Sequence, residues 1–196
     1  MYRVDELGNG VSFDPGTSLL LTGSSVDTDA KLLDAVAPAG DERCIVITTN
    51  KTADQVADEL LDRGVDPEKI GIIDCTSQDT TVEDVDVRQL SSPGDLTGIS
   101  LEFAKLVEEW GDSVPTRVGF ASVSTALMYA ETRTMFRFLH VFTARIRSAE
   151  MLGVFALDPE MHENQAYNTI RAVFTCEAEI GDAETELRGS GFRMQS

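Results

Sequence analysis

Short apolar runs alternate with amphipathic stretches along most of the chain. Continuous apolar runs predict five buried strands, at 18–22 (SLLLT), 44–48 (CIVIT), 70–75 (IGIIDC), 116–123 (TRVGFASV) and 151–157 (MLGVFAL). Apolar positions at helical spacing predict the intervening helices, one capped by Asp27 or Thr28 and others at 52–63, 101–110, 132–149 and 166–174. Residues 77–98 are polar, with one short strand at 85–90.

Repeated β–α–β units of this kind predict an α/β fold of three layers, in which helices cover both faces of a mostly parallel sheet. Residues 175–194 alternate around Gly181 and Gly189, which predicts a C-terminal antiparallel hairpin. No repeat, low-complexity tract or linker divides the sequence, so we expect a single domain over residues 1–196. Ligands bind such sheets beyond the carboxyl ends of the strands. The candidate positions are therefore 23–29, 48–52, 74–77, 121–125 and 158–162.

Charge narrows the classes of partner. The 34 acidic residues outnumber the 16 lysines and arginines, for a net charge of −18, and they are spread over the whole chain. This balance disfavours nucleic acid and anionic membranes, which bind through basic surfaces. An acidic surface repels itself in dilute buffer and is screened in molar salt, where the Debye length is about 3 Å. We interpret the chain as a halophile's protein; the alternative is an ordinary acidic protein.

The sequence also bears on location and redox chemistry. No apolar run approaches the roughly 20 residues that span a bilayer, and the first residues carry no secretory signal. We expect a cytoplasmic protein without a membrane segment. The three cysteines form no CxxC pair and are expected to be small buried hydrophobes. The two histidines lie far apart, so no metal site is expected.

The first strand leads into a glycine turn and a helix, as in phosphate-binding loops. Such a loop requires GxxxxGK[ST], in which amides and a lysine hold the phosphates and a hydroxyl holds Mg²⁺. Here the segment reads GSSVDTDA over residues 23–30. Gly23 is present, but Thr28 replaces the second glycine, Asp29 the lysine and Ala30 the hydroxyl residue. Asp27 and Asp29 would also repel a polyphosphate.

Several segments together resemble the RecA/KaiC-like ATPase superfamily, particularly its small haloarchaeal single-domain members. They are DPGTSLLLTG (14–23), TADQV (52–56), SPGDLTGI (92–99), FASVSTAL (120–127) and the end of the hairpin at Leu187 and Arg188. The resemblance covers nearly the whole chain and implies a P-loop-type sheet. It also implies that the Walker B aspartate corresponds to Ala121, next to Ser122, and that the catalytic glutamate falls near Asn50 and Lys51.

Three parts of a phosphoryl-transfer site are therefore missing, which predicts a pseudo-ATPase without catalytic residues. The degenerate nucleotide site comprises Gly23, Ser24, Ser25, Asp27, Thr28, Asp29, Asn50, Lys51, Ala121 and Ser122. We expect no cofactor; ATP with Mg²⁺ is the disfavoured alternative. A nucleotide sensor or residual ATPase would hold phosphate through backbone amides, with K⁺ or Mg²⁺ bridging to Asp27 and Asp29.

Other polar residues have two interpretations each. Asp158, Glu160 and His162 follow the fifth strand; they form either a metal or acid–base cluster with Asp74, or a solvated loop with an Asp-Pro turn. Ser122 and Ser124 are expected to be turn residues, since no nucleophile-elbow motif is present. His140 is expected to be a packed or surface residue of the long helix.

The long helix carries the only basic cluster, made of Arg133, Arg137, Arg145 and Arg147. One interpretation is a surface for an acidic protein partner or for a second copy, because members of the resembled family often form rings or dimers. The other is that these arginines pair with local acids such as Glu131 and Glu150. The sequence thus predicts a regulatory or signalling domain that acts through protein contacts.

Overall fold

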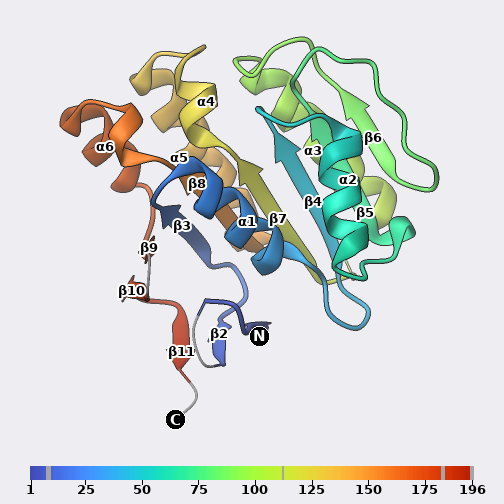
Figure 1. Cartoon of the computed structure of the whole chain (residues 1–196), viewed down its shortest axis with the longest axis horizontal. Helices are drawn as coiled ribbons and strands as arrows, with labels where there is room; N and C mark the ends of the chain where they lie inside the picture. The colour runs from blue at the N-terminus through green and yellow to red at the C-terminus, as the bar shows by residue number, and fades with distance from the viewer. Residues whose placement is uncertain (8–9, 112, 182–183, 195–196) are drawn as a thin grey trace.

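A mixed sheet of eight strands forms the centre of the molecule in the computed structural model, which describes residues 1–7, 10–111, 113–181 and 184–194 (Figure 1). The strand order is β10-β9-β3-β8-β7-β4-β5-β6. All neighbours are parallel except β9 and β10, which form an antiparallel hairpin. The strands are β3 (Ser18–Thr22), β4 (Arg43–Thr48), β5 (Ile70–Asp74), β6 (Asp86–Gln89), β7 (Thr116–Ala121), β8 (Leu152–Leu157), β9 (Cys176–Ile180) and β10 (Thr185–Gly189).

Helices cover both faces of this sheet. In Figure 1, α1 and α2 lie in front of the sheet, and α3 and α5 lie behind it. The helices are α1 (Ser25–Val36), α2 (Ala53–Asp62), α3 (Leu96–Trp110), α4 (Val123–Leu127), α5 (Thr132–Ser148) and α6 (Asn164–Arg171), with short 3₁₀ turns η1 (Pro67–Lys69) and η2 (Pro159–Met161). The predicted three-layer α/β fold with a C-terminal hairpin is confirmed.

Two hydrophobic cores lie on the two faces because successive side chains of a strand point in opposite directions. In β3, Leu19 and Leu21 face the core beneath α1 and α2, whereas Leu20 faces the core beneath α3 and α5. All three leucines are fully buried, which is why this strand reads as a continuous apolar run. The arrangement brings the carboxyl ends of β3, β4, β7 and β8 to one edge of the sheet.

A second, three-stranded sheet joins the two ends of the chain and was not predicted. It consists of β1 (Tyr2–Val4), β2 (Val11–Phe13) and β11 (Phe192–Met194), all antiparallel. Arg117 of β7 ties it to the main sheet: its guanidinium is buried, pairs with Glu42 at 2.6 Å and donates to the carbonyl oxygens of Ala35 and Arg3.

Capping side chains set three of the element boundaries that differ from the prediction. Helix α1 begins at Ser25, since Ser24 caps it, and not after Asp27 or Thr28. Helix α3 begins at Leu96, because the carboxylate of Asp95 accepts from the amide of Gly98. The fourth strand ends at Ala121, where α4 follows.

Candidate functional site

The turn between β3 and α1 contains only Gly23 and Ser24. Gly23 has φ 151°, and an added Cβ would lie 2.9 Å from the carbonyl oxygen of Ile180. The Ser24 hydroxyl caps the helix and contacts the carboxylate of Asp27 at 2.6 Å. A phosphate-binding loop needs several residues to wrap its amides around the phosphates, and this two-residue turn has no such segment.

A carboxylate of the protein itself occupies the amino end of α1. Asp158, which follows β8, accepts hydrogen bonds through Oδ2 from the amide nitrogen of Ser25 at 3.1 Å and from its hydroxyl at 3.0 Å. Its other oxygen accepts from the amide of Glu160 at 3.0 Å. A helix amino terminus attracts an anion through its unpaired N–H groups and its dipole. Asp158 is that anion here.

Thr28 and Asp29 lie inside α1 rather than in a loop. The Thr28 hydroxyl donates to the carbonyl oxygen of Ser24 at 3.0 Å. Asp29 is buried, and its Oδ2 accepts from the side-chain amide of Asn50 at 2.8 Å, whereas its Oδ1 has no hydrogen-bond partner among the described residues. Burial raises the pKa of Asp29, and the hydrogen bond from Asn50 and the charge of Lys51 oppose the rise.

The residues after β4 bind neighbouring helices. Asn50 contacts α1 through Asp29, as described above. The ammonium of Lys51 pairs with Glu59 of α2 at 2.7 Å. The carboxylate of Asp74, at the end of β5, accepts from the amide of Ala53 and so holds the start of α2. The polar groups of this part of the edge are therefore engaged with protein groups.

The end of β7 carries no carboxylate. Ala121 is buried, and Ser122 caps α4 by accepting from the amide of Thr125 at 3.2 Å. Thr49 bridges β4 to this turn, because its hydroxyl accepts from the amide of Ser122 at 2.8 Å and donates to the carbonyl oxygen of the same residue at 2.9 Å. Hydroxyl groups thus make the polar contacts between the ends of β4 and β7.

Ser124 and His162 form a contact that the sequence did not predict. The Ser124 hydroxyl is buried, lies 2.9 Å from Nε2 of His162 and accepts from the amide of Asp158 at 2.9 Å. Burial lowers the pKa of His162, and Asp158 opposes this shift. The predicted cluster with Asp74 is wrong, because β7 and β4 separate β8 from β5. The alternative, a solvated loop with an Asp-Pro turn, agrees with the structure: Asp158 caps the turn η2, which begins at Pro159 and contains no buried residue. Asp158 and His162 also contact α1 and α4.

A cavity of about 430 Å³ opens beside Gly23, between β9, η2 and α6. Its buried carboxylate, Glu177, accepts from the hydroxyl of Tyr167 at 2.9 Å and from Nε of Arg171 at 2.6 Å. Arg188, at the rim, pairs with Glu186 at 2.8 Å. Both cavity arginines are thus already neutralised by protein carboxylates, so the cavity offers no uncompensated positive charge to a phosphate.

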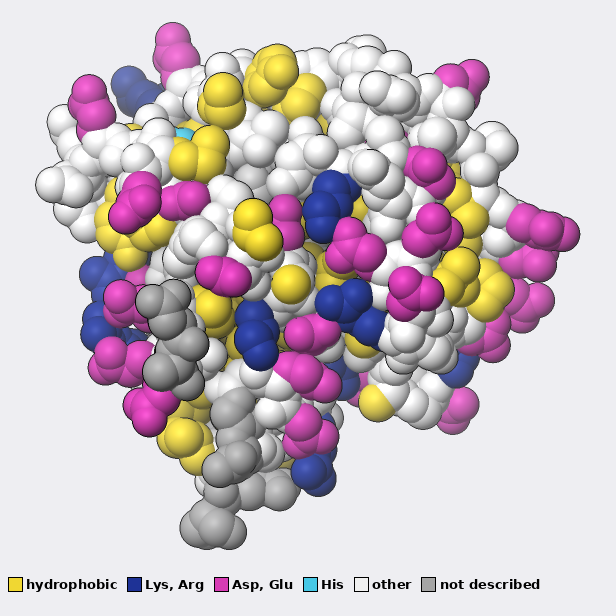
Figure 2. Space-filling model, viewed as in Figure 1, with side chains coloured by type: hydrophobic (Ala, Val, Ile, Leu, Met, Phe, Trp, Pro, Cys, Tyr) yellow, Lys and Arg dark blue, Asp and Glu magenta, His cyan; other side chains and the backbone are white. Residues whose placement is uncertain are grey.

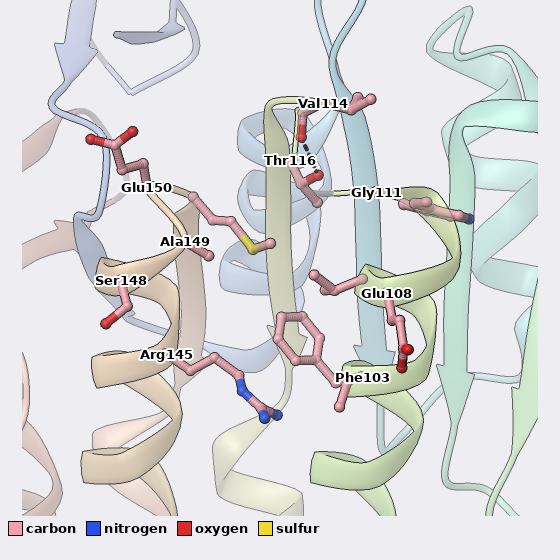
Figure 3. Close-up of a pocket in the computed structure, with 13 residues that line it drawn as sticks. Phe103, Glu108, Gly111, Val114, Thr116, Arg145, Ser148, Ala149 and Glu150 are labelled. Carbon is pink, nitrogen blue, oxygen red and sulfur yellow. Dashed lines mark hydrogen bonds between the residues drawn. The ribbon is translucent and has the colours of Figure 1, made fainter.

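A wider cavity of about 700 Å³ lies at the opposite, amino-terminal edge of the sheet, between α3 and α5 (Figure 3). Phe103 and Met151 contribute apolar walls, and Arg145 reaches toward it from α5. None of the predicted nucleotide-site residues lines this cavity. The described residues contain no group of three or more His, Cys, Asp or Glu side chains that could hold a metal ion.

The four arginines of α5 are all exposed. Within the described part of the chain, none of them lies within 4.0 Å of a carboxylate oxygen. The predicted alternative, pairing with Glu131 and Glu150, is therefore not observed. The arginines elsewhere that form ion pairs are Arg3, Arg63, Arg88, Arg117, Arg171, Arg188 and Arg193. No helix in the described ranges is both long and apolar enough to cross a membrane.

The strand order and the helices on both faces of the sheet give this chain a KaiC-like fold. Two solved structures from Pyrococcus horikoshii OT3 are similar to it. One, the protein PH0250, has a TM-score of 0.65 and 15% identity, with 91% of this chain and 88% of that chain covered. The other, the KaiC-like protein PH0186, has a TM-score of 0.64 and 14% identity, with 97% and 87% covered. At these identities the likeness concerns the fold alone.

The chain belongs to a family of unknown function, DUF7504, whose model matches residues 16–180. The matched region begins before β3 and ends with β9, so it includes the whole carboxyl edge of the parallel sheet. No curated protein matches the chain.

Proposed function

We propose that this protein is a non-catalytic RecA/KaiC-like domain, a pseudo-ATPase that acts in regulation or signalling through protein contacts in a halophilic archaeon. The observation that carries the proposal is the carboxylate of Asp158 at the amino end of α1. An internal anion there satisfies the amide that would bind a phosphate and repels a second anion.

The surrounding residues support the same function. The two-residue turn is too short to wrap a triphosphate. Asp29 stands within α1 where a loop would offer a lysine, and Lys51 is paired with Glu59. Neither Ala121 nor Ser122 has a carboxylate for Mg²⁺. Phosphoryl transfer depends on positioning and on positive charge around the phosphates, and this edge supplies neither.

Phosphate release from Mg–ATP tests the loss of catalysis. We expect no turnover above a buffer blank at about 2 M KCl, a salt level that screens the acidic surface. The control variant is Asp29→Asn, which removes one charge from the degenerate nucleotide site without adding a catalytic group. Turnover that this substitution alters would support the alternative, a residual ATPase or nucleotide sensor of the KaiC/RecA type.

Protein contact through α5 is the second part of the proposal. Its exposed arginines lack carboxylate partners among the described residues, although the chain as a whole is strongly acidic. Arg145 donates to the carbonyl oxygen of Ser100 at 3.3 Å, which leaves its charge uncompensated. Arginines without a carboxylate partner on an acidic protein favour an acidic partner, because complementary charge steers and orients association. Charge reversal at Arg137 and Arg145 should abolish partner capture; unchanged capture would refute this surface.

A further inference from the structure

The charges of α2 and α5 are complementary. Helix α5 carries four arginines and no acidic residue, and α2 carries four acidic residues and no basic one (ADQVADELLD). Asp54, Asp58 and Asp62 are exposed and, within the described ranges, form no ion pair. Figure 2 shows acidic side chains in a row over α2.

The charged positions on both helices have the same spacing. On α5, Arg133, Arg137, Val141 and Arg145 follow one another at intervals of four, and on α2 the three aspartates do the same. Residues four apart form one ridge of a helix, about 6 Å from one to the next. Two such ridges with equal spacing can pair residue by residue. Val141, which is 68% exposed, occupies the third position of this ridge, so its charged part next to the start of the helix is Arg133 and Arg137.

Both ridges place charges at unfavourable ends of their own helices. Arg133 lies in the first turn of α5, which holds no acid, and Asp62 is the last residue of α2, whose last turn holds no base. A cation near an amino terminus and an anion near a carboxyl terminus both oppose the helix dipole. A partner that brings Asp62 beside Arg133 compensates both unfavourable charges. An antiparallel alignment of the two helices then places Asp58 beside Arg137.

From these charges we propose that α5 of one molecule docks on α2 of a second copy of this chain, antiparallel, with Arg133 beside Asp62 and Arg137 beside Asp58. The proposal deepens the proposed function, on which it rests, by naming the partner of the α5 surface. The two helices lie on opposite faces of the sheet (Figure 1). The contact is therefore heterologous, and repeated use of it produces an open chain or a closed ring rather than a symmetric pair.

The contact area of two short helices favours weak association. Stable complexes bury roughly 800 Å² per partner, and a single helix pair with charged ridges covers less. We expect association at micromolar to submillimolar protein concentration. The experiment therefore uses sedimentation velocity over about 10–500 μM protein, at about 0.5 M KCl, where the Debye length of 4–5 Å screens general repulsion but leaves direct contacts.

Two neutralised variants test the interface. Arg133→Gln/Arg137→Gln removes the basic ridge, and Asp58→Asn/Asp62→Asn removes the acidic ridge. Each should weaken self-association at least about tenfold, since close charge pairs across interfaces are strongly coupled. The controls are Arg3→Gln/Arg193→Gln and Asp5→Asn/Asp41→Asn, which make the same charge changes at exposed positions elsewhere and should associate like the wild type.

Mixing the two neutralised variants gives the decisive result. One variant retains the acidic α2 and the other retains the basic α5, so they should form a one-to-one dimer that grows no further. Wild-type protein should form larger species. A wild-type monomer at all concentrations, or variants that associate as the wild type does, would overturn this proposal. Either result leaves the nucleotide measurements unaffected, so the loss of catalysis is tested separately.

Discussion

Substitution of Asp158 provides the most specific test of how the carboxyl edge of the parallel sheet is built. Its carboxylate accepts three hydrogen bonds, two from Ser25 and one from Glu160. A hydrogen bond to a charged group contributes about 1.5–3 kcal/mol, and loss of a helix cap costs about 0.5–2 kcal/mol. Asp158 is half-buried, so in the variant water replaces part of the lost hydrogen bonding and reduces the cost. We expect Asp158→Ala to lower the free energy of unfolding by about 2 kcal/mol.

The matched substitutions separate the hydrogen bonds from the charge. Asp158→Asn keeps a carbonyl acceptor and loses the charge, and its cost should be about 1 kcal/mol, the size of a helix-dipole interaction. Asp79→Ala removes a charge at an exposed loop position and should cost nothing measurable. This control is needed because any lost negative charge relieves repulsion in a chain of net charge −18.

The assay is thermal unfolding at about 2 M KCl. For a domain of this size, 1 kcal/mol corresponds to a Tm shift of roughly 2–4 °C, so Asp158→Ala should melt about 4–8 °C lower than Asp79→Ala. Equal melting of the two variants would refute the role of Asp158 as the anion of α1. We also expect no ATP binding by Asp158→Ala, because the turn stays two residues long.

Three further predictions concern other parts of the molecule. Arg117→Met should lower the free energy of unfolding by about 3 kcal/mol, since it leaves Glu42 and two carbonyl oxygens without their partner; denaturant unfolding measures this, and a loss under 1 kcal/mol would contradict it. Asp29→Asn should stabilise the protein at neutral pH, because burial raises the pKa of Asp29 and its charged form therefore costs stability as pH rises through that pKa. The gain should vanish below about pH 4, where the carboxyl is protonated in both states, and a gain independent of pH would argue against it. Thermal stability of the wild type should rise from about 0.1 M to 2 M KCl, as screening of an acidic surface requires; equal melting at both salts would refute the halophile interpretation.

The main sheet was predictable from the sequence because its central strands are buried on both faces. Leu19, Leu20 and Leu21 read as one apolar run, and such runs are typical of parallel strands beneath helices. The start of α1 was not predictable in the same way, since Ser24, Asp27 and Thr28 are all residue types that cap helices. The small terminal sheet was missed because its three-residue strands are too short to show a period.

The sequence predicted which residues lie at the candidate site, but not which of them contact one another. The strand-end rule located Gly23, Asn50 and Ser122 at one edge, and the structure places the ends of β3, β4 and β7 there. The contact of Asp158 with Ser25 joins residues 133 positions apart and has no local signature. The Asp-Pro turn directly after the fifth strand was the one signal that could have directed attention to it.

Calorimetry with ATP and with ADP, at about 2 M KCl with Mg²⁺, tests the central claim most directly. If Asp158 and a two-residue turn replace the phosphate site, no binding heat is expected up to millimolar nucleotide. Binding with a Kd below about 100 μM, a free energy of roughly −5.5 kcal/mol, would contradict it. The edge would then hold phosphate despite its carboxylates, and the protein would be a nucleotide sensor.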